Sequence, residues 1–297
     1  MKYVVGIDCG GTKTIAQAYS LDGKLLETFE TGFGNVTVDY QKGINHITEC
    51  IHNIYTILGK EKCVALTLGI AGIDSGGMKE KVHSDLSVLH PSIHILNDGQ
   101  LAHYAILKGA DGITVTAGTG SVILGLSQNE WYRVGGWGHL LGDEGSAYSI
   151  ALQSIKYCLH QYDKGCEADY FAKEVLSFFR VTTVFELSKK IYRLNKGEIA
   201  SLASHIAKIY DHNLIAQEII TQASQELGKQ LLEMIKKIPL EEPIFIGLNG
   251  SLIEKNKHIL SSLTIFLEEN EIHYQLLKKQ APCTIGAYYL YKRNEEN

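Results

Sequence analysis

The chain has 297 residues, 45% of them hydrophobic and 21% charged, so it is long enough for two domains that each bury a core. Its 28 basic and 33 acidic residues give a formal net charge of -5 and form no basic stripe, which argues against a nucleic-acid partner. Charged residues interrupt every apolar run before it reaches the roughly 18 residues that span a bilayer, so we expect no membrane partner.

The N-terminus and the cysteines predict a cytoplasmic protein. The first apolar run ends at Asp8, which is too early for a signal peptide. The 6 cysteines lie far apart and form no CxxC pair, which argues against zinc ribbons, iron–sulfur sites and a disulfide framework. We interpret them as reduced thiols.

The first third of the chain alternates short strands with helices. Its strands are predicted at Tyr3–Ile7, Thr14–Leu21, Lys24–Glu30, Cys63–Ile70 and His94–Asn97. From Tyr40 to Leu58 the isoleucines recur at the spacing of one helix face, which predicts a helix. The stretch "NDGQLAHYAILKG" leads from the last of these strands into a second helix.

The same order of elements then begins again. Strands are predicted at Ile113–Ala117, Ser121–Leu126 and Trp131–Val134, with a glycine turn between the first two. The glycine turns begin at Gly10 and Gly118, 108 residues apart. This repetition predicts an internal duplication, with domains at 1–110 and 111–297.

The remainder is mainly helical. Helices are predicted at Asp143–Tyr162, Tyr170–Phe179, Thr183–Leu194 and Asn213–Ile238. A strand at Pro243–Leu248 and a terminal helix complete the chain. Strands and helices mixed in this order predict an α/β protein.

The two glycine turns, in "DCGGTKT" and "AGTGS", have the same chemistry. Small residues leave backbone N–H groups open to an anion, and the threonine hydroxyls add donors. Either turn could be only a tight hairpin, because neither matches the P-loop pattern or opens directly into a helix. Two such turns in a duplicated unit favour phosphate binding.

Two carboxylates stand where predicted strands end. Asp8 is either a turn-forming residue or a ligand of Mg²⁺, which prefers carboxylate and phosphate oxygens. Asp98 is either the cap of the helix that follows or a general base for a sugar hydroxyl. Position alone leaves both pairs of alternatives open.

These stretches resemble the motifs of one family. In family order they are "GIDCGGTKT" at the first phosphate site, "NDG" with a catalytic aspartate, "TAGTGS" at the second phosphate site and "IGLNGSL" at the adenosine. "VGGWGHLLGDEGSAY" is the most specific match. The chain is similar throughout to sugar kinases of the actin and hexokinase superfamily, in the N-acetylglucosamine kinase branch grouped with the BadF/BadG/BcrA/BcrD ATPases.

The resemblance implies a fold and ligands. It implies two ribonuclease-H-like domains of the actin-like ATPase type with a ligand cleft between them. The last helix, about 284–297, would pack back on the N-terminal domain. ATP and Mg²⁺ would be the cofactors, a small-molecule sugar the substrate, and a homodimer the assembly.

The resemblance also implies roles for single residues. Asp98 would be the general base for the sugar 6-hydroxyl, and Asp8 would serve Mg²⁺. The residues implied at ATP are Gly10, Gly11, Thr12, Lys13, Gly118, Thr119, Gly120, Gly247 and Gly250. The residues implied at the sugar are Asn35, Asp98, Thr119 and Asp143. A helix cap is the alternative role for Asp143.

The implied activity is ATP-dependent phosphorylation of an amino sugar at its 6-hydroxyl, with N-acetylglucosamine giving its 6-phosphate. N-acetylmuramic acid, glucosamine and glucose are alternative substrates, because no residue identifies the acetamido pocket. An ATPase activator would need a cysteine pair for an iron–sulfur cluster, and a helix end separates Cys158 from Cys166. A non-catalytic sugar-responsive regulator would need a DNA-binding module, for which Met1–Asp8 leaves no room.

Overall fold

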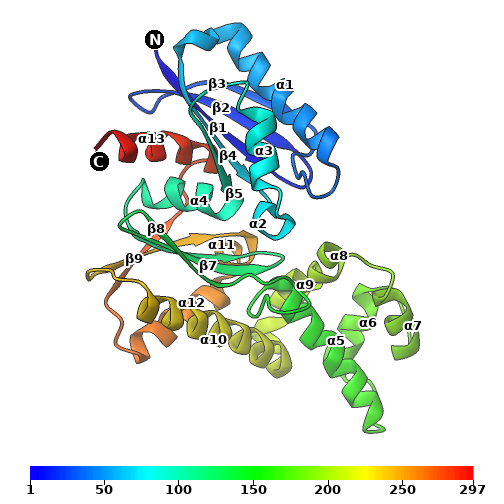
Figure 1. Ribbon diagram of the computed structural model, residues 1–297. Helices are drawn as coiled ribbons and strands as arrows, with labels where there is room; N and C mark the ends of the chain where they lie inside the picture. The colour runs from blue at the N-terminus through cyan, green and yellow to red at the C-terminus, as the bar shows by residue number, and fades with distance from the viewer. Residues whose placement is uncertain (297) are drawn as a thin grey trace. The chain divides into compact units, whose positions relative to one another are not determined.

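The computed structural model describes residues 1–296 and divides into two compact units (Figure 1). The first unit comprises Met1–Gly112 together with 277–297, and the second comprises Ile113–Leu276. Whether the chain acts as domains 1–110 and 111–297 stays a prediction. No helix among the described residues is long and apolar enough to cross a membrane.

A five-stranded mixed sheet forms the centre of the first unit. Its strands are β1 (Tyr3–Cys9), β2 (Thr14–Ser20), β3 (Leu25–Thr31), β4 (Cys63–Ile70) and β5 (Ile93–Asn97). They lie in the order β3-β2-β1-β4-β5. β1 runs parallel to β4, and β4 to β5, so the carboxyl ends of these three strands share one edge.

Helices cover both faces of this sheet. They are α1 (Tyr40–Leu58), α2 (Ile73–Gly76), α3 (Lys79–Leu86), α4 (Asp98–Leu107) and α13 (Gly286–Glu296), with short 3-10 turns η1 (Lys60–Lys62) and η3 (Cys283–Ile285). α1 packs on β2 and β3, whereas α4 and α13 pack on β1 and β4. β1 is covered on both faces, which agrees with the continuous apolar run of its residues from Tyr3 to Ile7.

The C-terminal segment is fastened to the first sheet by a close backbone contact. A Cβ atom added to Gly6 in β1 would lie 1.9 Å from the carbonyl oxygen of Thr284, so only glycine fits there. Thr284 also meets Tyr19 and Gln17 of β2 in a buried hydrogen-bonded cluster, in which the Tyr19 hydroxyl lies 2.9 Å from Thr284 Oγ1. Residues far apart in the sequence therefore share one core.

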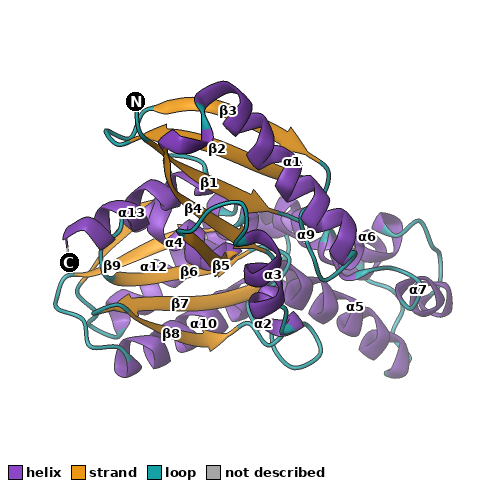
Figure 2. Ribbon diagram, turned by 45° about the horizontal axis from the view of Figure 1, so that its top comes forward, coloured by secondary structure: helices purple, strands orange, loops and turns teal. Residues whose placement is uncertain are grey.

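The second unit repeats the strand order of the first. Its strands are β6 (Gly112–Ala117), β7 (Ser121–Ser127), β8 (Glu130–Gly135), β9 (Ile244–Asn249) and β10 (Tyr274–Lys278). Their order, β10-β9-β6-β7-β8, matches the first sheet strand for strand, with β6 in the place of β1. The repeated order of strand, glycine turn and strand predicted from the sequence is thus present in both sheets (Figure 2).

Helices supply most of the second unit. They are α5 (Ala147–Asp163), α6 (Tyr170–Phe178), α7 (Val184–Ile191), α8 (Lys196–Ala200), α9 (Leu202–Ile209), α10 (Leu214–Lys237), α11 (Ser251–Lys255) and α12 (Lys257–Glu269), with a 3-10 turn η2 (Tyr210–His212). α10 packs on β7 and β8 and against α12, while α5 packs against α6, α8 and α9. One core of aliphatic side chains joins these elements.

The predicted elements are largely confirmed, and some boundaries are corrected. The helix predicted from Asp143 begins at Ala147, because Ser146 caps it and Asp143 has a left-handed φ of 66°. The helix predicted to Leu194 ends at Ile191. The strand β10 and the helices α3, α8 and α9 were not predicted.

Candidate active site

Asp8 and Asp98 lie at the same edge of the first sheet. Asp8 is the second-last residue of β1, where it pairs with Gly69 of the neighbouring strand β4. Asp98 directly follows β5, whose last residue, Asn97, pairs with Ile70 of β4. Only one strand separates the two carboxylates, at the edge where α/β sheets bind ligands.

Asp98 does not cap its helix. The cap of α4 is Asn97, whose side chain accepts a hydrogen bond from the Gln100 N–H at 2.7 Å. The side-chain oxygen of Gln100 accepts a hydrogen bond from the Asn97 N–H at 3.1 Å, which completes a capping box. Asp98 is the first residue of α4, and its carboxylate accepts from the adjacent Gly99 N–H at 3.0 Å. The cap alternative is therefore wrong, and the carboxylate remains exposed to solvent.

The two carboxyls resist ionisation. Burial raises the pKa of Asp8, and the charge of Asp98 raises it further, whereas Lys279 and Lys13 oppose this. Asp98 keeps access to solvent, but desolvation by the protein atoms around it raises its pKa, and the charge of Asp74 adds to this effect. The negative charges of Asp8 and Asp98 repel each other, so ionisation of one carboxyl makes ionisation of the other less favourable. A cation or a transferred proton would relieve it.

The first glycine turn is a tight hairpin next to Asp8. The Gly10 N–H donates to the Lys13 carbonyl at 3.0 Å, and the Gly34 N–H donates to the Gly10 carbonyl at 2.9 Å. Gly11 and Thr12 are exposed, and Lys13 is paired with Glu30 at 2.9 Å. The turn-forming alternative for Asp8 does not describe this geometry, because Asp8 lies within the strand and the turn starts at Gly10.

Asn35 is held near this turn by Gly34. Its side-chain oxygen accepts from the Thr37 N–H at 2.9 Å and from the Thr37 hydroxyl at 2.6 Å. A Cβ atom on Gly34 would lie 2.5 Å from Thr14 Oγ1, so glycine permits the close approach of the two segments. The first unit therefore contains Asp8, Asp98, the turn Gly10–Lys13 and Asn35. The turn follows Asp8 in the chain, and its hydrogen bond to Gly34 holds it next to Asn35.

The donor set around Asp8 suits Mg²⁺. Among residues 1–296 no group of three or more His, Cys, Asp or Glu side chains forms a metal cage. Mg²⁺ needs none, because it commonly binds one or two carboxylates together with phosphate oxygens and water. Asp8 offers a hard oxygen whose ionised form is destabilised by burial, a penalty that a divalent cation would offset.

The second glycine turn, Gly118–Gly120, joins β6 to β7. The Gly118 N–H donates to the Gly120 carbonyl at 2.9 Å. The Gly118 carbonyl accepts from the Ala147 N–H at 2.9 Å, so the turn is attached to the first residue of α5. Thr119 is exposed. The exposed Thr119 hydroxyl and the glycine backbone on either side of it are groups of the kind that binds phosphate.

Asp143 lies beneath this turn in a buried ion pair. Its carboxylate accepts from Lys196 Nζ at 2.6 Å and from the Ser121 N–H at 3.4 Å. The Asp143 side chain is 4% exposed and that of Lys196 is 30% exposed. A Cβ atom on Gly120 would lie 2.8 Å from Lys196 Nζ, so the ion pair lies directly against the turn. The cap alternative for Asp143 is wrong, since Ser146 caps α5.

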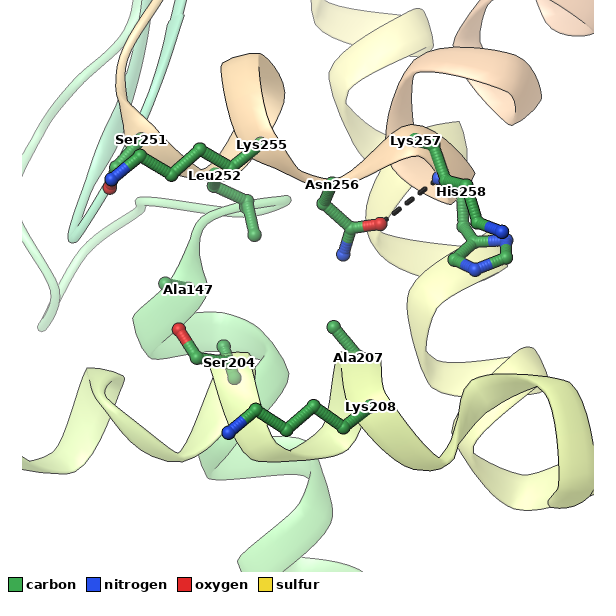
Figure 3. A pocket seen from close by; sticks show the side chains of 11 residues that line it. Ala147, Ser204, Ala207, Lys208, Ser251, Leu252, Lys255, Asn256, Lys257 and His258 are labelled. Carbon is green, nitrogen blue, oxygen red and sulfur yellow. Dashed lines mark hydrogen bonds between the residues drawn. The ribbon is translucent and has the colours of Figure 1, made fainter.

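A cavity of about 510 Å³ opens beside the same turn (Figure 3). Its walls come from the start of α5, one face of α9, and α11 with the segment that follows it. The lining residues are Ala147, Ala203, Ser204, Ala207, Lys208, Ser251, Leu252, Lys255, Asn256, Lys257 and His258. The ring of His258 stacks on Tyr210 with centroids 3.7 Å apart. Apolar walls with several cationic side chains suit a flat ligand that carries negative charge.

The cavity and the turn are contiguous. Ala147, which lines the cavity, is hydrogen-bonded to Gly118. A Cβ atom on Gly118 would lie 3.9 Å from the backbone nitrogen of Ser251, another lining residue. Of the two glycines predicted at adenosine, Gly250 directly precedes Ser251. Gly247 is buried inside β9, paired with Thr114, and does not line the cavity.

Several site residues were not found from the sequence. Lys196 lies in no recognisable motif, and its pairing with Asp143 could not be predicted because the two residues are far apart in the chain. The small residues Ala203 and Ala207 are spaced by one helical turn, which is a signal for a close approach on one helix face. Asn256 stands before an apolar helix, a pattern that indicates a cap and says nothing about a ligand.

Comparison with known proteins gives a match over almost the whole chain. The model of the BadF/BadG/BcrA/BcrD ATPase family matches residues 5–290. An N-acetylmuramic acid/N-acetylglucosamine kinase of Clostridium acetobutylicum is 30% identical over 300 residues, covering 97% of each chain. An N-acetyl-D-glucosamine kinase of Dictyostelium discoideum is 27% identical over 311 residues, covering 96% of each.

A solved structure shows the same fold. A protein of Chromobacterium violaceum, named as a candidate N-acetylglucosamine kinase, superimposes with a TM-score of 0.77. The alignment covers 98% of this chain and 99% of the other at 19% identity, so it bears on the fold alone. It confirms the predicted α/β class with two sheets of the ribonuclease-H-like, actin-like ATPase type.

Proposed function

This chain belongs to the BadF/BadG/BcrA/BcrD ATPase family, and on that basis we propose that it is an ATP-dependent amino-sugar kinase. It transfers the γ-phosphoryl group of ATP to the 6-hydroxyl of an amino sugar, with N-acetylglucosamine as the first expected substrate. The names of its relatives support this class of substrate. The homodimer and the cytoplasmic location stay predictions.

The observation that carries the proposal is the contact between the cavity and the glycine turn of the second unit. A nucleotide has a flat apolar end and an anionic end, and the second unit offers a site for each. The base and ribose occupy the cavity beside Ala203 and Leu252, and the phosphates lie at Gly118–Gly120. The hydrogen bond between Ala147 and Gly118 fixes the distance from one part to the other.

Asp98 handles the proton in the reaction. The sugar 6-oxygen forms a bond to the γ-phosphorus as the bond from that phosphorus to the β,γ-bridging oxygen breaks, which releases ADP. The hydroxyl proton passes to the Asp98 carboxylate. Asp98 suits this role because its side chain is accessible to solvent and makes no cap. Desolvation by the protein atoms around it raises its pKa, which makes it a stronger base. Positioning and charge neutralisation do the rest of the catalysis.

Asp8 holds Mg²⁺, which neutralises the charge of the β- and γ-phosphates when bound. Gly10, Gly11, Thr12 and Lys13 form the hairpin that follows it and offer donors to the phosphates. Lys13 exchanges its exposed partner Glu30 for a phosphate at little cost, because exposed ion pairs contribute little stability.

Asn35, Thr119 and Asp143 hydrogen-bond the sugar. The amide nitrogen of Asn35 is available for this, since the side-chain oxygen is used by Thr37. Asp143 keeps Lys196 beside it, so a sugar hydroxyl either joins that pair or displaces the ammonium. N-acetylmuramic acid, glucosamine and glucose are the alternative substrates.

The test is coupled ADP release with MgATP and a panel of sugars. The panel contains N-acetylglucosamine, N-acetylmuramic acid, N-acetylmannosamine, glucosamine and glucose. We expect turnover on N-acetylated sugars, and a loss of about 10²- to 10⁴-fold in Asp98→Asn with nucleotide binding retained. Asp85→Asn is the matched control, because Asp85 is exposed on α3 and accepts a hydrogen bond from the Tyr40 hydroxyl.

Two results would overturn the proposal. The kinase assignment is wrong if no sugar in the panel stimulates ADP release above slow hydrolysis. The base assignment is wrong if Asp98→Asn retains the turnover of Asp85→Asn while the wild-type enzyme is active.

A further inference from the structure

Asn256 lies at the junction of two helices and lines the cavity. It ends α11 and caps α12. Its side-chain oxygen accepts from the His258 N–H at 3.0 Å, drawn as a dashed line in Figure 3, and from the Ile259 N–H at 3.3 Å. The residue is 8% exposed.

The amide nitrogen of Asn256 is buried and has no hydrogen-bond partner among the residues that the structure describes. Figure 3 shows it directed across the cavity towards the helix that carries Ser204 and Ala207. A buried amide donor without a partner costs free energy, typically enough to be avoided in folded proteins. Its position in the cavity wall indicates that a ligand supplies the missing acceptor.

The cap fixes which atom faces the ligand. If the amide turned over, its NH₂ group would face the backbone N–H groups of His258 and Ile259, and two acceptor bonds would be lost. Asn256 therefore presents a donor to the cavity and cannot present its oxygen. It can meet a ring nitrogen or carbonyl of a nucleobase, but it cannot accept from an exocyclic amine.

We propose that Asn256 is a base-recognition residue, whose amide donates to an acceptor on the nucleobase of the bound nucleotide. This rests on the proposed function, which places the base in the same cavity. Apolar walls at Ala203, Ala207 and Leu252 exclude water from the bond, which makes an unmatched donor more costly. Every unsubstituted purine ring carries such acceptors.

The test removes the donor and keeps the cap. Asn256→Asp retains an oxygen that accepts from the helix N–H groups and replaces the NH₂ group by a second oxygen. Asn213→Asp is the matched control, because Asn213 caps α10 through the Ala216 N–H at 2.9 Å and does not line the cavity. ATP dissociation constants are measured by calorimetry without sugar. We expect binding weakened about 10- to 100-fold in Asn256→Asp and unchanged in Asn213→Asp.

A second measurement uses the wild-type protein, so it does not depend on whether Asn256→Asp folds. ATP analogues that replace one ring nitrogen by C–H, namely 1-deaza-, 3-deaza- and 7-deaza-ATP, are bound to the wild-type protein. We expect one of them to bind about 10- to 100-fold more weakly than ATP, because it lacks the acceptor. That analogue should show no further loss in Asn256→Asp.

The outcomes separate this inference from the proposed function. If all three analogues bind the wild-type protein like ATP, or if Asn256→Asp binds ATP like Asn213→Asp, base recognition by Asn256 is wrong. If the wild-type protein binds ATP with this discrimination but phosphorylates no sugar, the inference stands and the kinase proposal fails. If it binds no nucleotide, both fail.

Discussion

Replacing Lys196 by methionine tests how strongly the buried pair under the second glycine turn is held. The Lys196 ammonium lies 2.6 Å from Asp143, whose side chain is 4% exposed. Methionine keeps most of the stem and removes the charge. The carboxylate is then left with the Ser121 N–H at 3.4 Å, a long hydrogen bond.

The expected cost follows from the burial of each partner. Removing one partner of a fully buried ion pair costs about 3–5 kcal/mol, because a buried charge remains unpaired. Lys196 is 30% exposed, so water can partly replace its ammonium. We therefore expect the free energy of unfolding to fall by about 2–3 kcal/mol, between the values for buried and exposed pairs.

The assay is urea unfolding at pH 7 with a double-mutant cycle. Asp143→Asn, Lys196→Met and the double variant give the coupling energy, expected at about 1–2 kcal/mol. Lys236→Met is the control, because its pair with Glu233 is 2.9 Å long but the two side chains are 68% and 63% exposed. That control should cost no more than about 0.5 kcal/mol. The reasoning is refuted if Lys196→Met costs no more than Lys236→Met.

Four further predictions concern the sheet edge, the sugar and the C-terminal segment. Folding raises the pKa of Asp98 above 3.8, so the ionised side chain destabilises the folded protein as pH rises above that value. At pH 7 we therefore expect Asp98→Asn to unfold at a higher temperature than the wild-type protein. An equal or lower Tm would contradict this. A protonated Asp98 cannot accept the sugar proton, so kcat should fall as pH drops through the raised pKa of this residue. A kcat that stays constant down to pH 3.8 would argue against Asp98 as the base. Asp143→Ala should raise the sugar KM, and unchanged steady-state kinetics would remove it from the sugar site. Gly6→Ala should lower the free energy of unfolding by about 3 kcal/mol, because its Cβ would meet the Thr284 carbonyl at 1.9 Å; a loss below 1 kcal/mol in urea would show that the segment moves freely.

Elements with a strong local pattern were predictable from the sequence. The strand Cys63–Ile70 has both predicted ends in place, because a buried parallel strand is a continuous apolar run. The helix α1 was predicted from its one apolar face. The strand β10 was not, because its residues are largely half-buried or exposed and carry a weak alternation. Helix α8 is too short to show a period.

The candidate site was predictable where chemistry and chain position coincide. Asp8, Asp98 and both glycine turns are local features of strand ends, so they could be identified one by one. Lys196 could not, because only the fold brings it to Asp143. The cap of α4 could not be assigned from the sequence for a related reason: Asn97 and Asp98 are adjacent and both cap helices well, and backbone geometry decides between them.

The fastening of Thr284 to Gly6 has a consequence for how the protein is made. During synthesis the ribosome releases β1 long before η3 and α13, with residues 113–276 in between. The part of the first sheet around Val4 and Tyr19, which packs against Ile285 and Tyr288, therefore stays uncovered until the second unit has emerged. The unit that is translated first is completed last. Until η3 and α13 pack on it, the apolar surface of its sheet is exposed and prone to aggregation.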